Sequence, residues 1–269
     1  MTEKIGILGC GWLGFPLAKS LIQKNYEVHG TTTSLDKLEL LKNEGISPYT
    51  VSLSASKIEG EIQDFLSQID TLIINIPPRL RGTNKESFFD KMQLLLEAIK
   101  SSSVLRIIFI SSTAVYGDVS GEVTEETPTM PNTESGKQLV QAETLFQTDD
   151  SIRTTVIRFG GLIGPKRNPV TMLSGRTGLR NGHDPINLIH LEDCIHMITT
   201  ILEKGYWGEL FNGVYPHHPA KRDFYTEQAQ KLDIPAPIYL EDSNENPGKT
   251  VVSRNFLDKS HAFNTSIAL

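Results

Sequence analysis

The chain has 269 residues, of which 38% are hydrophobic and 22% charged, and its formal net charge is -6 at pH 7. This length suits one large α/β domain, or a dinucleotide domain with a small cap, and leaves little room for two large domains. Lysine and arginine are scattered and form no basic stripe, so we expect no nucleic-acid partner. No apolar stretch approaches the roughly 18 to 20 residues of a membrane span, and no signal peptide is recognised. We therefore expect a cytoplasmic protein with no membrane partner.

The two cysteines, Cys10 and Cys194, have neither a CxxC partner nor a cluster of metal-ligating residues beside them. We therefore expect free thiols, no disulfide framework and no metal site. Nothing in the composition indicates an oligomeric state.

Short apolar runs alternate with helical patterns over the first 160 residues. Because parallel strands need crossover connections, this alternation predicts an α/β fold with a doubly wound parallel Rossmann sheet and helices on both faces. The predicted strands cover residues 5–8, 26–31, 49–53, 70–76, 105–110 and 152–159, and the predicted helices cover residues 12–24, 35–43, 61–68, 87–101 and 134–147.

Beyond residue 160, glycines and prolines break the chain into loops. A helix over 192–204 and a strand over 209–214 look like a return to the main sheet, and a further helix is predicted over 221–232. We divide the chain accordingly: residues 1–165 plus 187–214 form the dinucleotide-binding domain, and residues 166–186 plus 215–269 form a small C-terminal cap that faces the substrate.

A GxGxxG pattern, GCGWLG in this chain, lies between the first strand and the first helix. Gly9 would permit the tight turn, Gly11 the close approach of a pyrophosphate, and Gly14 close packing of helix on strand. Trp12 and Leu13 would border the same ligand. The strand-turn-helix context favours a dinucleotide site over a plain tight turn.

The end of the second strand lacks the acidic residue that usually binds the adenine ribose of NAD. Hydroxyl groups and a lysine stand there instead and could accommodate a 2′-phosphate, so NADP is favoured over NAD. Asp36 comes later and reads as an acid at the start of a helix. The candidate phosphate ligands are Thr31, Thr32, Thr33, Ser34 and Lys37.

The run SSTAVYG follows the strand over 105–110, and here the sequence resembles the extended short-chain dehydrogenases/reductases, the NAD-dependent epimerase/dehydratase family. The resemblance implies that Ser112, four residues before Tyr116, is the catalytic serine and that Ser111 borders the cofactor. A hydroxyl at a strand end in a crevice can hydrogen-bond a carbonyl or alcohol during hydride transfer. The alternative is that both serines only satisfy backbone groups of the loop.

Two later segments extend the resemblance. The run RFGGLIGP resembles the family's loop against the nicotinamide, which implies cofactor contacts from Phe159, Gly160 and Gly161. The run IHLED resembles a further family segment. In it, His190 could act as an acid or base, or be structural, whereas Asp193 reads as a helix N-cap or first-turn acid.

The strand over 70–76 is followed by two prolines, Pro77 and Pro78, in the part of the chain that resembles the family's loop beside the cofactor. The resemblance implies cofactor contacts from Ile76 and Pro77. Arg79 and Arg81 follow, and they could meet a phosphate or a substrate anion or could be solvated loop charges.

The resemblance breaks at the family's YxxxK segment. Lys137 matches the lysine, which implies contact with the nicotinamide ribose, but Thr133 stands where the tyrosine belongs. A phenol near a lysine can transfer a proton, whereas an aliphatic hydroxyl is a far poorer acid. This departure resembles the atypical short-chain dehydrogenases, including proteins of the nucleoside-diphosphate-sugar epimerase-like type.

Two functions remain open from the sequence. The first is an NAD(P)-dependent oxidoreductase or epimerase-like enzyme for a small polar, sugar-like molecule, with Ser112 and Lys137 in the site and Tyr116 or His190 as proton donor. The second is a sensor or regulator that binds NAD(P) without turnover, which the missing tyrosine favours.

Overall fold

The computed structural model describes residues 3–78, 80, 86–241 and 247–268. The predicted anion contacts of Arg79 and Arg81 fall outside this range. Within it, no helix has the length and apolar character needed to cross a membrane.

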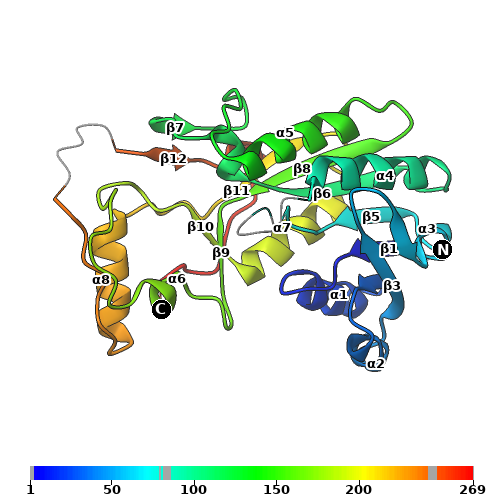
Figure 1. Ribbon diagram of the computed structural model, residues 1–269, viewed down its shortest axis with the longest axis horizontal. Helices are drawn as coiled ribbons and strands as arrows, with labels where there is room; N and C mark the ends of the chain where they lie inside the picture. The colour runs from blue at the N-terminus through cyan, green and yellow to red at the C-terminus, as the bar shows by residue number, and fades with distance from the viewer. Residues whose placement is uncertain (1–2, 79, 81–85, 242–246, 269) are drawn as a thin grey trace.

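The main sheet has eight strands in the order β11-β8-β6-β5-β1-β2-β3-β4 (Figure 1). Every neighbouring pair is parallel except β3 and β4. Chain order reverses beside β1, which places a topological switch point there, where ligands of open α/β sheets bind. The strands are β1 (Lys4–Leu8), β2 (Glu27–Thr32), β3 (Ser47–Leu53), β4 (Ile58–Gly60), β5 (Thr71–Ile74), β6 (Arg106–Ser112), β8 (Arg153–Phe159) and β11 (Leu210–Gly213).

Helices cover both faces of this sheet (Figure 1). Alternate strand residues point to opposite faces, so Ile73 joins one buried cluster while Leu72 and Ile74 join the other. The first cluster also takes the apolar stripes of α1 (Gly14–Gln23), α2 (Asp36–Asn43) and α7 (Leu191–Lys204), and the second those of α3 (Ile62–Ser67), α4 (Phe88–Lys100) and α5 (Glu134–Gln147).

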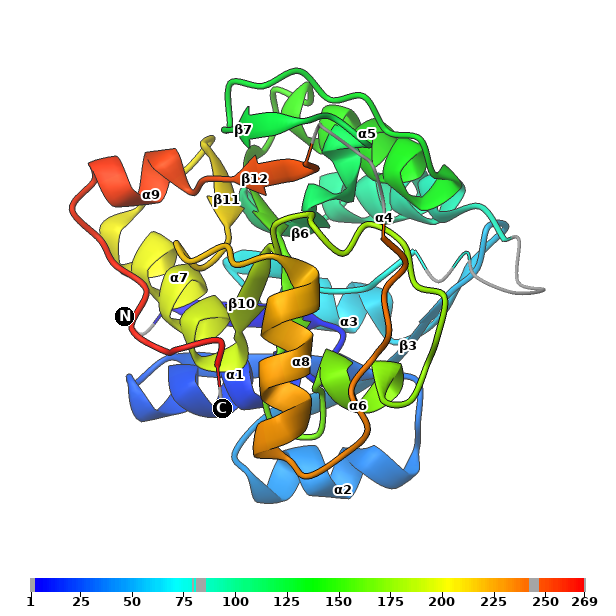
Figure 2. The same cartoon turned by 90° about the vertical axis from the view of Figure 1, so that its left-hand side faces the viewer.

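A smaller unit lies beyond the carboxyl ends of the strands (Figure 2). It contains the parallel pair β9 (Gly161–Ile163) and β10 (Leu188–His190), with α6 (Pro169–Leu173) and α8 (Lys221–Lys231). Val170, Phe224 and Ile267 belong to its own buried cluster. A second parallel pair joins β7 (Gly121–Val123) to β12 (Lys249–Val251), and η1 (Thr113–Tyr116) and α9 (Arg254–Asp258) complete the fold.

The predicted doubly wound parallel sheet is confirmed. The first helix begins at Gly14 rather than at residue 12, because the glycine-rich turn takes up the intervening residues. The division into two domains stays a prediction. Within the segment assigned to the cap, however, Val251, Phe256 and Phe263 pack into the two large clusters of the main sheet.

Candidate functional site

The glycine-rich turn after β1 has three glycines with three different surroundings. Gly9 has φ of 105°, which favours glycine, and a Cβ there would lie 2.7 Å from the carbonyl oxygen of Asn75. A Cβ on Gly14 would overlap the carbonyl oxygen of Gly9. A Cβ on Gly11 would meet no atom within 4 Å. The turn is therefore closed at Gly9 and Gly14 and open at Gly11, as a pyrophosphate at the start of α1 requires.

Two side chains hold this turn. The Thr31 hydroxyl accepts a 3.0 Å hydrogen bond from the backbone N-H of Gly9, and the Asn75 side chain donates a 3.0 Å bond to the carbonyl oxygen of Gly9. Thr31 is buried. Its hydroxyl therefore shapes the turn, and its predicted contact with a 2′-phosphate stays a prediction.

The remaining candidate phosphate ligands lie beyond β2. Thr33 and Lys37 are exposed. The Thr32 hydroxyl accepts a 3.1 Å bond from the backbone N-H of Ser34, which turns the chain toward α2. Asp36 stands in the first turn of α2, the position expected for it. Hydroxyls and one ammonium are thus available at this end of the crevice.

Trp12 joins the glycine turn to the loop after β9. Its indole N-H donates a 2.9 Å bond to the carbonyl oxygen of Pro165, and the Arg167 guanidinium lies 5.0 Å from the centre of the indole ring. Leu13 is buried in the cluster beneath α1. The contact with Arg167 was not foreseen, because it joins positions more than 150 residues apart with no local pattern.

Ser112 ends β6 at the carboxyl edge of the sheet. The side chain is partly exposed, and its Oγ accepts a 3.2 Å bond from the backbone N-H of Ala114 at the start of η1. Ile76 and the exposed Pro77 follow the neighbouring strand β5 at the same edge. The structure therefore brings Ser112 and the end of β5 to the edge where the glycine turn also lies.

A buried polar network lies beneath Ser112. The Ser111 hydroxyl donates a 2.5 Å bond to Glu143, which forms a 2.6 Å ion pair with Arg158. Arg158 Nη1 donates a 3.0 Å bond to the Tyr116 hydroxyl. All four side chains are buried. The Ser111 hydroxyl is thus committed to Glu143 and does not point toward a cofactor.

Tyr116 is fully buried, and its hydroxyl also donates a 2.8 Å bond to Asn212. Burial raises the pKa of the Tyr116 phenol, and the Arg158 charge opposes this rise. The phenol has partners inside the protein and no exposed surface. This placement corrects the hypothesis that Tyr116 supplies the proton for catalysis.

The network continues to Glu125, whose Oε1 accepts from the backbone N-H groups of Asn212 and Asn255 at 2.9 and 3.2 Å. Its Oε2 is buried with no hydrogen-bond partner among the described residues. Burial raises the pKa of the Glu125 carboxyl. We expect this acid to influence stability rather than chemistry, because it lies inside the protein.

Thr133, which the sequence resemblance aligns with the tyrosine of the YxxxK segment, is the N-cap of α5. Its Oγ1 accepts a 3.1 Å bond from the backbone N-H of Gly136. Lys137 stands in the first turn of the same helix with an exposed side chain. The segment thus presents an ammonium to solvent, while the threonine hydroxyl serves the helix.

The loop after β8 approaches the crevice with its backbone. Gly161 N-H donates a 2.8 Å bond to the carbonyl oxygen of Asn187, and a Cβ on Gly160 would lie 2.6 Å from that oxygen. Phe159 is buried beneath the sheet edge, so only its backbone can border a cofactor. The expected contact of this residue with the cofactor is therefore one of its backbone, and it stays a prediction.

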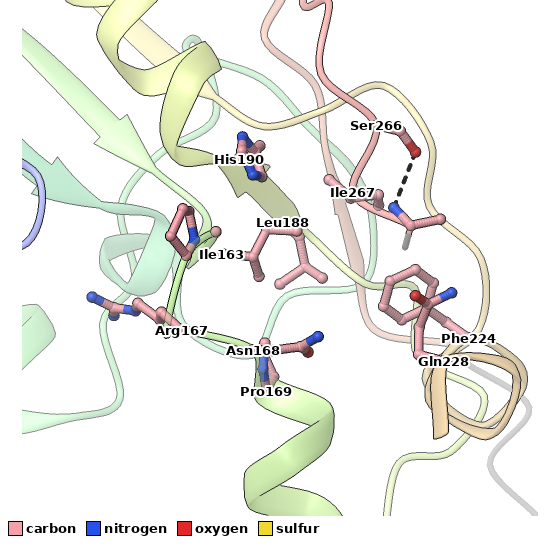
Figure 3. Close-up of a pocket in the computed structure, with 13 residues that line it drawn as sticks. Ile163, Arg167, Asn168, Pro169, Leu188, His190, Phe224, Gln228, Ser266 and Ile267 are labelled. Carbon is pink, nitrogen blue, oxygen red and sulfur yellow. Dashed lines mark hydrogen bonds between the residues drawn. The ribbon is translucent and has the colours of Figure 1, made fainter. Parts of the chain in front are cut away.

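His190 lies at a cavity lined by β9, β10, the start of α6, α8 and the C-terminal segment, with a volume of about 280 Å³ (Figure 3). His190 is the N-cap of α7, and its Nδ1 accepts a 3.2 Å bond from the backbone N-H of Glu192. Neutral imidazole then carries its proton on Nε2. The lining side chains that Figure 3 labels include Ile163, Arg167, Asn168, Leu188, Phe224, Gln228, Ser266 and Ile267.

Asp193 lies in the first turn of α7 as predicted, but the cap of the helix is His190. Asp193 is 1% exposed, and its carboxylate accepts from the backbone N-H groups of Asn264 and Thr265 at 2.9 and 3.1 Å. It therefore anchors the C-terminal segment, whose residues Ser266 and Ile267 form one wall of the cavity. Sequence spacing gave no signal for this contact.

No group of three or more histidine, cysteine, aspartate or glutamate side chains within the described ranges could hold a metal ion. Burial raises the pKa of Cys10 to about 12, so this thiol is a poor nucleophile. The polar groups available at the crevice are thus hydroxyls, amides, imidazole and cations.

Comparison with known proteins gives a consistent result. Residues 5–212 match the model of the NAD dependent epimerase/dehydratase family. Protein YeeZ of Escherichia coli is 34% identical over 250 residues, which cover 93% of this chain and 91% of YeeZ. A protein named "Uncharacterized UDP-glucose epimerase YtcB" from Bacillus subtilis is 25% identical over 241 residues, 78% of this chain and 76% of YtcB.

Among solved structures, UDP-glucuronic acid 4-epimerase from Bacillus cereus in complex with NAD superposes with a TM-score of 0.79. The alignment covers 98% of this chain and 93% of that chain at 19% sequence identity. At that identity the likeness shows a shared fold.

Proposed function

The chain belongs to the NAD dependent epimerase/dehydratase family, and we propose that it is an NAD(P)-dependent oxidoreductase of the epimerase type for a small polar, sugar-like substrate. The observation that carries this proposal is the open space at Gly11 on the sheet edge where Ser112 also ends its strand. A fold alone does not choose a chemistry, so the assignment depends on these residues. The cytoplasmic location and the lack of a nucleic-acid partner stay predictions.

The proposed roles follow from what each side chain can reach. A bound nicotinamide would accept or return a hydride. The partly exposed Ser112 hydroxyl hydrogen-bonds the reacting oxygen, and the exposed Lys137 ammonium binds the nicotinamide ribose. His190 is the remaining candidate for proton transfer, because its Nε2 carries the exchangeable proton at the cavity wall.

The preference for NADP over NAD is supported by Thr33, Ser34 and Lys37 at the end of β2, where an acid would repel a 2′-phosphate. Mass spectrometry of protein purified without added nucleotide tests this preference. We expect co-purified NADP. Co-purified NAD would contradict the preference while leaving the dinucleotide site intact.

A second candidate function is an NAD(P)-binding sensor without turnover. It is favoured by one observation, that the Thr133 hydroxyl caps α5. The two functions are separated by incubating the protein with NADP⁺ and UDP-glucuronic acid or UDP-glucose, and following nicotinamide reduction and sugar epimerisation. Turnover that Ser112→Ala abolishes supports the enzyme, and tight cofactor binding with no turnover supports the sensor.

A further inference from the structure

Lys249, at the start of β12, is a partly buried cation that forms no ion pair with a carboxylate of the described residues. Its Nζ donates a hydrogen bond to the carbonyl oxygen of Gly117, and no ion pair among the described residues includes it. An ammonium has three donors, so this bond leaves two for a ligand. By contrast Lys221, from α8, is paired with Asp184 at 2.9 Å.

The backbone around Lys249 fixes its position at the crevice. The Asn187 side chain donates a 2.8 Å bond to the carbonyl oxygen of Lys249 and accepts a 2.7 Å bond from the N-H of Val251. The carbonyl oxygen of the same Asn187 accepts from Gly161, the first residue of β9. Lys249 is therefore held beside the segment expected to border the nicotinamide.

On its other side, Lys249 contacts the end of η1. That turn begins at Ser112 and ends at Gly117, and a 3-10 helix rises about 2 Å per residue, so the two ends are on the order of 10 Å apart. A molecule that reaches from Ser112 to Lys249 must span that distance. A sugar ring with a charged substituent has this size.

Two described charges act on Lys249. Burial, together with Lys221 from α8, lowers the pKa of Lys249, and Asp118, from the loop after η1, opposes this. Asp118 also accepts a hydrogen bond from Asn132, and Asp184, which binds the backbone of neighbouring Gly248, is paired with Lys221. Among the described residues, neither carboxylate forms an ion pair with Lys249.

Keeping a cation partly out of water without an anion is unfavourable, and the cost falls when an anion binds. We propose that Lys249 binds an oxyanion of the substrate, either a carboxylate or a phosphate, while the reacting hydroxyl lies near Ser112. This inference rests on the proposed function for the identity of the ligand as substrate. It narrows the substrate class to anionic sugars.

The test observes Lys249 itself. Lysines are dimethylated with isotopically labelled methyl groups, which keep the positive charge, and the Lys249 resonance is assigned from Lys249→Arg. We expect glucuronate, inorganic phosphate or both to shift this resonance saturably, whereas neutral glucose does not. The anion that shifts the resonance shows whether Lys249 binds a carboxylate or a phosphate. No shift with either anion, or an equal shift with glucose, would overturn the proposal.

Variants give an independent check. Lys249→Gln should weaken binding of the effective anion at least about tenfold, because a charge-assisted hydrogen bond is lost, and Lys249→Arg should retain most of it. The matched control is Lys259→Gln, which removes a lysine paired with Glu209. Unchanged anion affinity in Lys249→Gln would contradict the proposal. NADPH binding, measured on the same samples, reports separately on the proposed function.

Discussion

The cofactor end and the substrate end of the crevice are built in different ways. The glycine turn, β2 and Asn75 come from the first 75 residues, and backbone geometry fixes them. The end that we propose for the substrate instead depends on side chains from distant segments: Ser112 at the end of β6, and His190, Phe224 and Ile267 around the cavity. The difference teaches that a substitution at the proposed substrate end, such as the threonine at position 133, leaves the contacts that hold the glycine turn unchanged.

The largest expected effect is at Gly11. Gly11→Val should abolish NADPH binding, because its side chain fills the space that a pyrophosphate would take, whereas the melting temperature should stay near that of the unmodified protein. Calorimetry and thermal unfolding measure the two effects. Gly14→Ala is the contrasting variant, because the added Cβ would overlap the Gly9 carbonyl oxygen. We expect this variant to have a lower melting temperature than the unmodified protein. Normal NADPH binding by Gly11→Val would show that the cofactor does not bind at this turn.

The next effect separates two adjacent serines. Ser112→Ala should lower turnover by about 10² to 10⁴, the range for a positioned acid-base or hydrogen-bonding group, with little change in cofactor affinity. Ser111→Ala should instead lower the free energy of unfolding by roughly 1 to 3 kcal/mol, since buried Glu143 loses its hydroxyl donor and keeps only those of Arg158. Steady-state kinetics and denaturant unfolding measure both. Equal loss of turnover in the two variants would show that Ser112 has no specific role in catalysis.

The anchoring of the C-terminal segment gives a third test. Asp193→Ala should lower the free energy of unfolding by about 2 to 3 kcal/mol, because two backbone N-H groups lose a charged acceptor. Hydrogen exchange should show faster exchange at Asn264 and Thr265. Substrate affinity should fall as well, because Ile267 of the same segment lines the cavity. Unchanged exchange at these two amides would contradict the anchor.

The smallest effect concerns Glu125 and pH. Its folded-state pKa is raised by burial, so its contribution to stability is fully present below the unfolded pKa of about 4.3 and is lost as pH rises through the folded value. Glu125→Gln should therefore be more stable than the unmodified protein at pH 7, by on the order of 1 kcal/mol. Denaturant unfolding at several pH values measures this. A pH-independent difference would mean that Glu125 does not titrate in this range.

Most of the sheet could be predicted from the sequence, because strand and helix periods are local signals and glycines at the turn have local geometric causes. Contacts such as Asp193 with Asn264, or Trp12 with Arg167, could not, because they join residues far apart in the chain. The burial of Ser111 and Tyr116 could not be predicted for the same reason. Their partners Glu143 and Asn212 come from other elements, and only the fold reveals their burial.

The most direct measurement of the central claim is a calorimetric titration of the unmodified protein with NADPH and with NADH. We expect saturable binding at one site per chain, tighter for NADPH, because Gly11 is open to a pyrophosphate and no acid ends β2. Tighter binding of NADH would contradict the phosphate preference. Absence of binding by either dinucleotide would contradict the account of the crevice as a cofactor site.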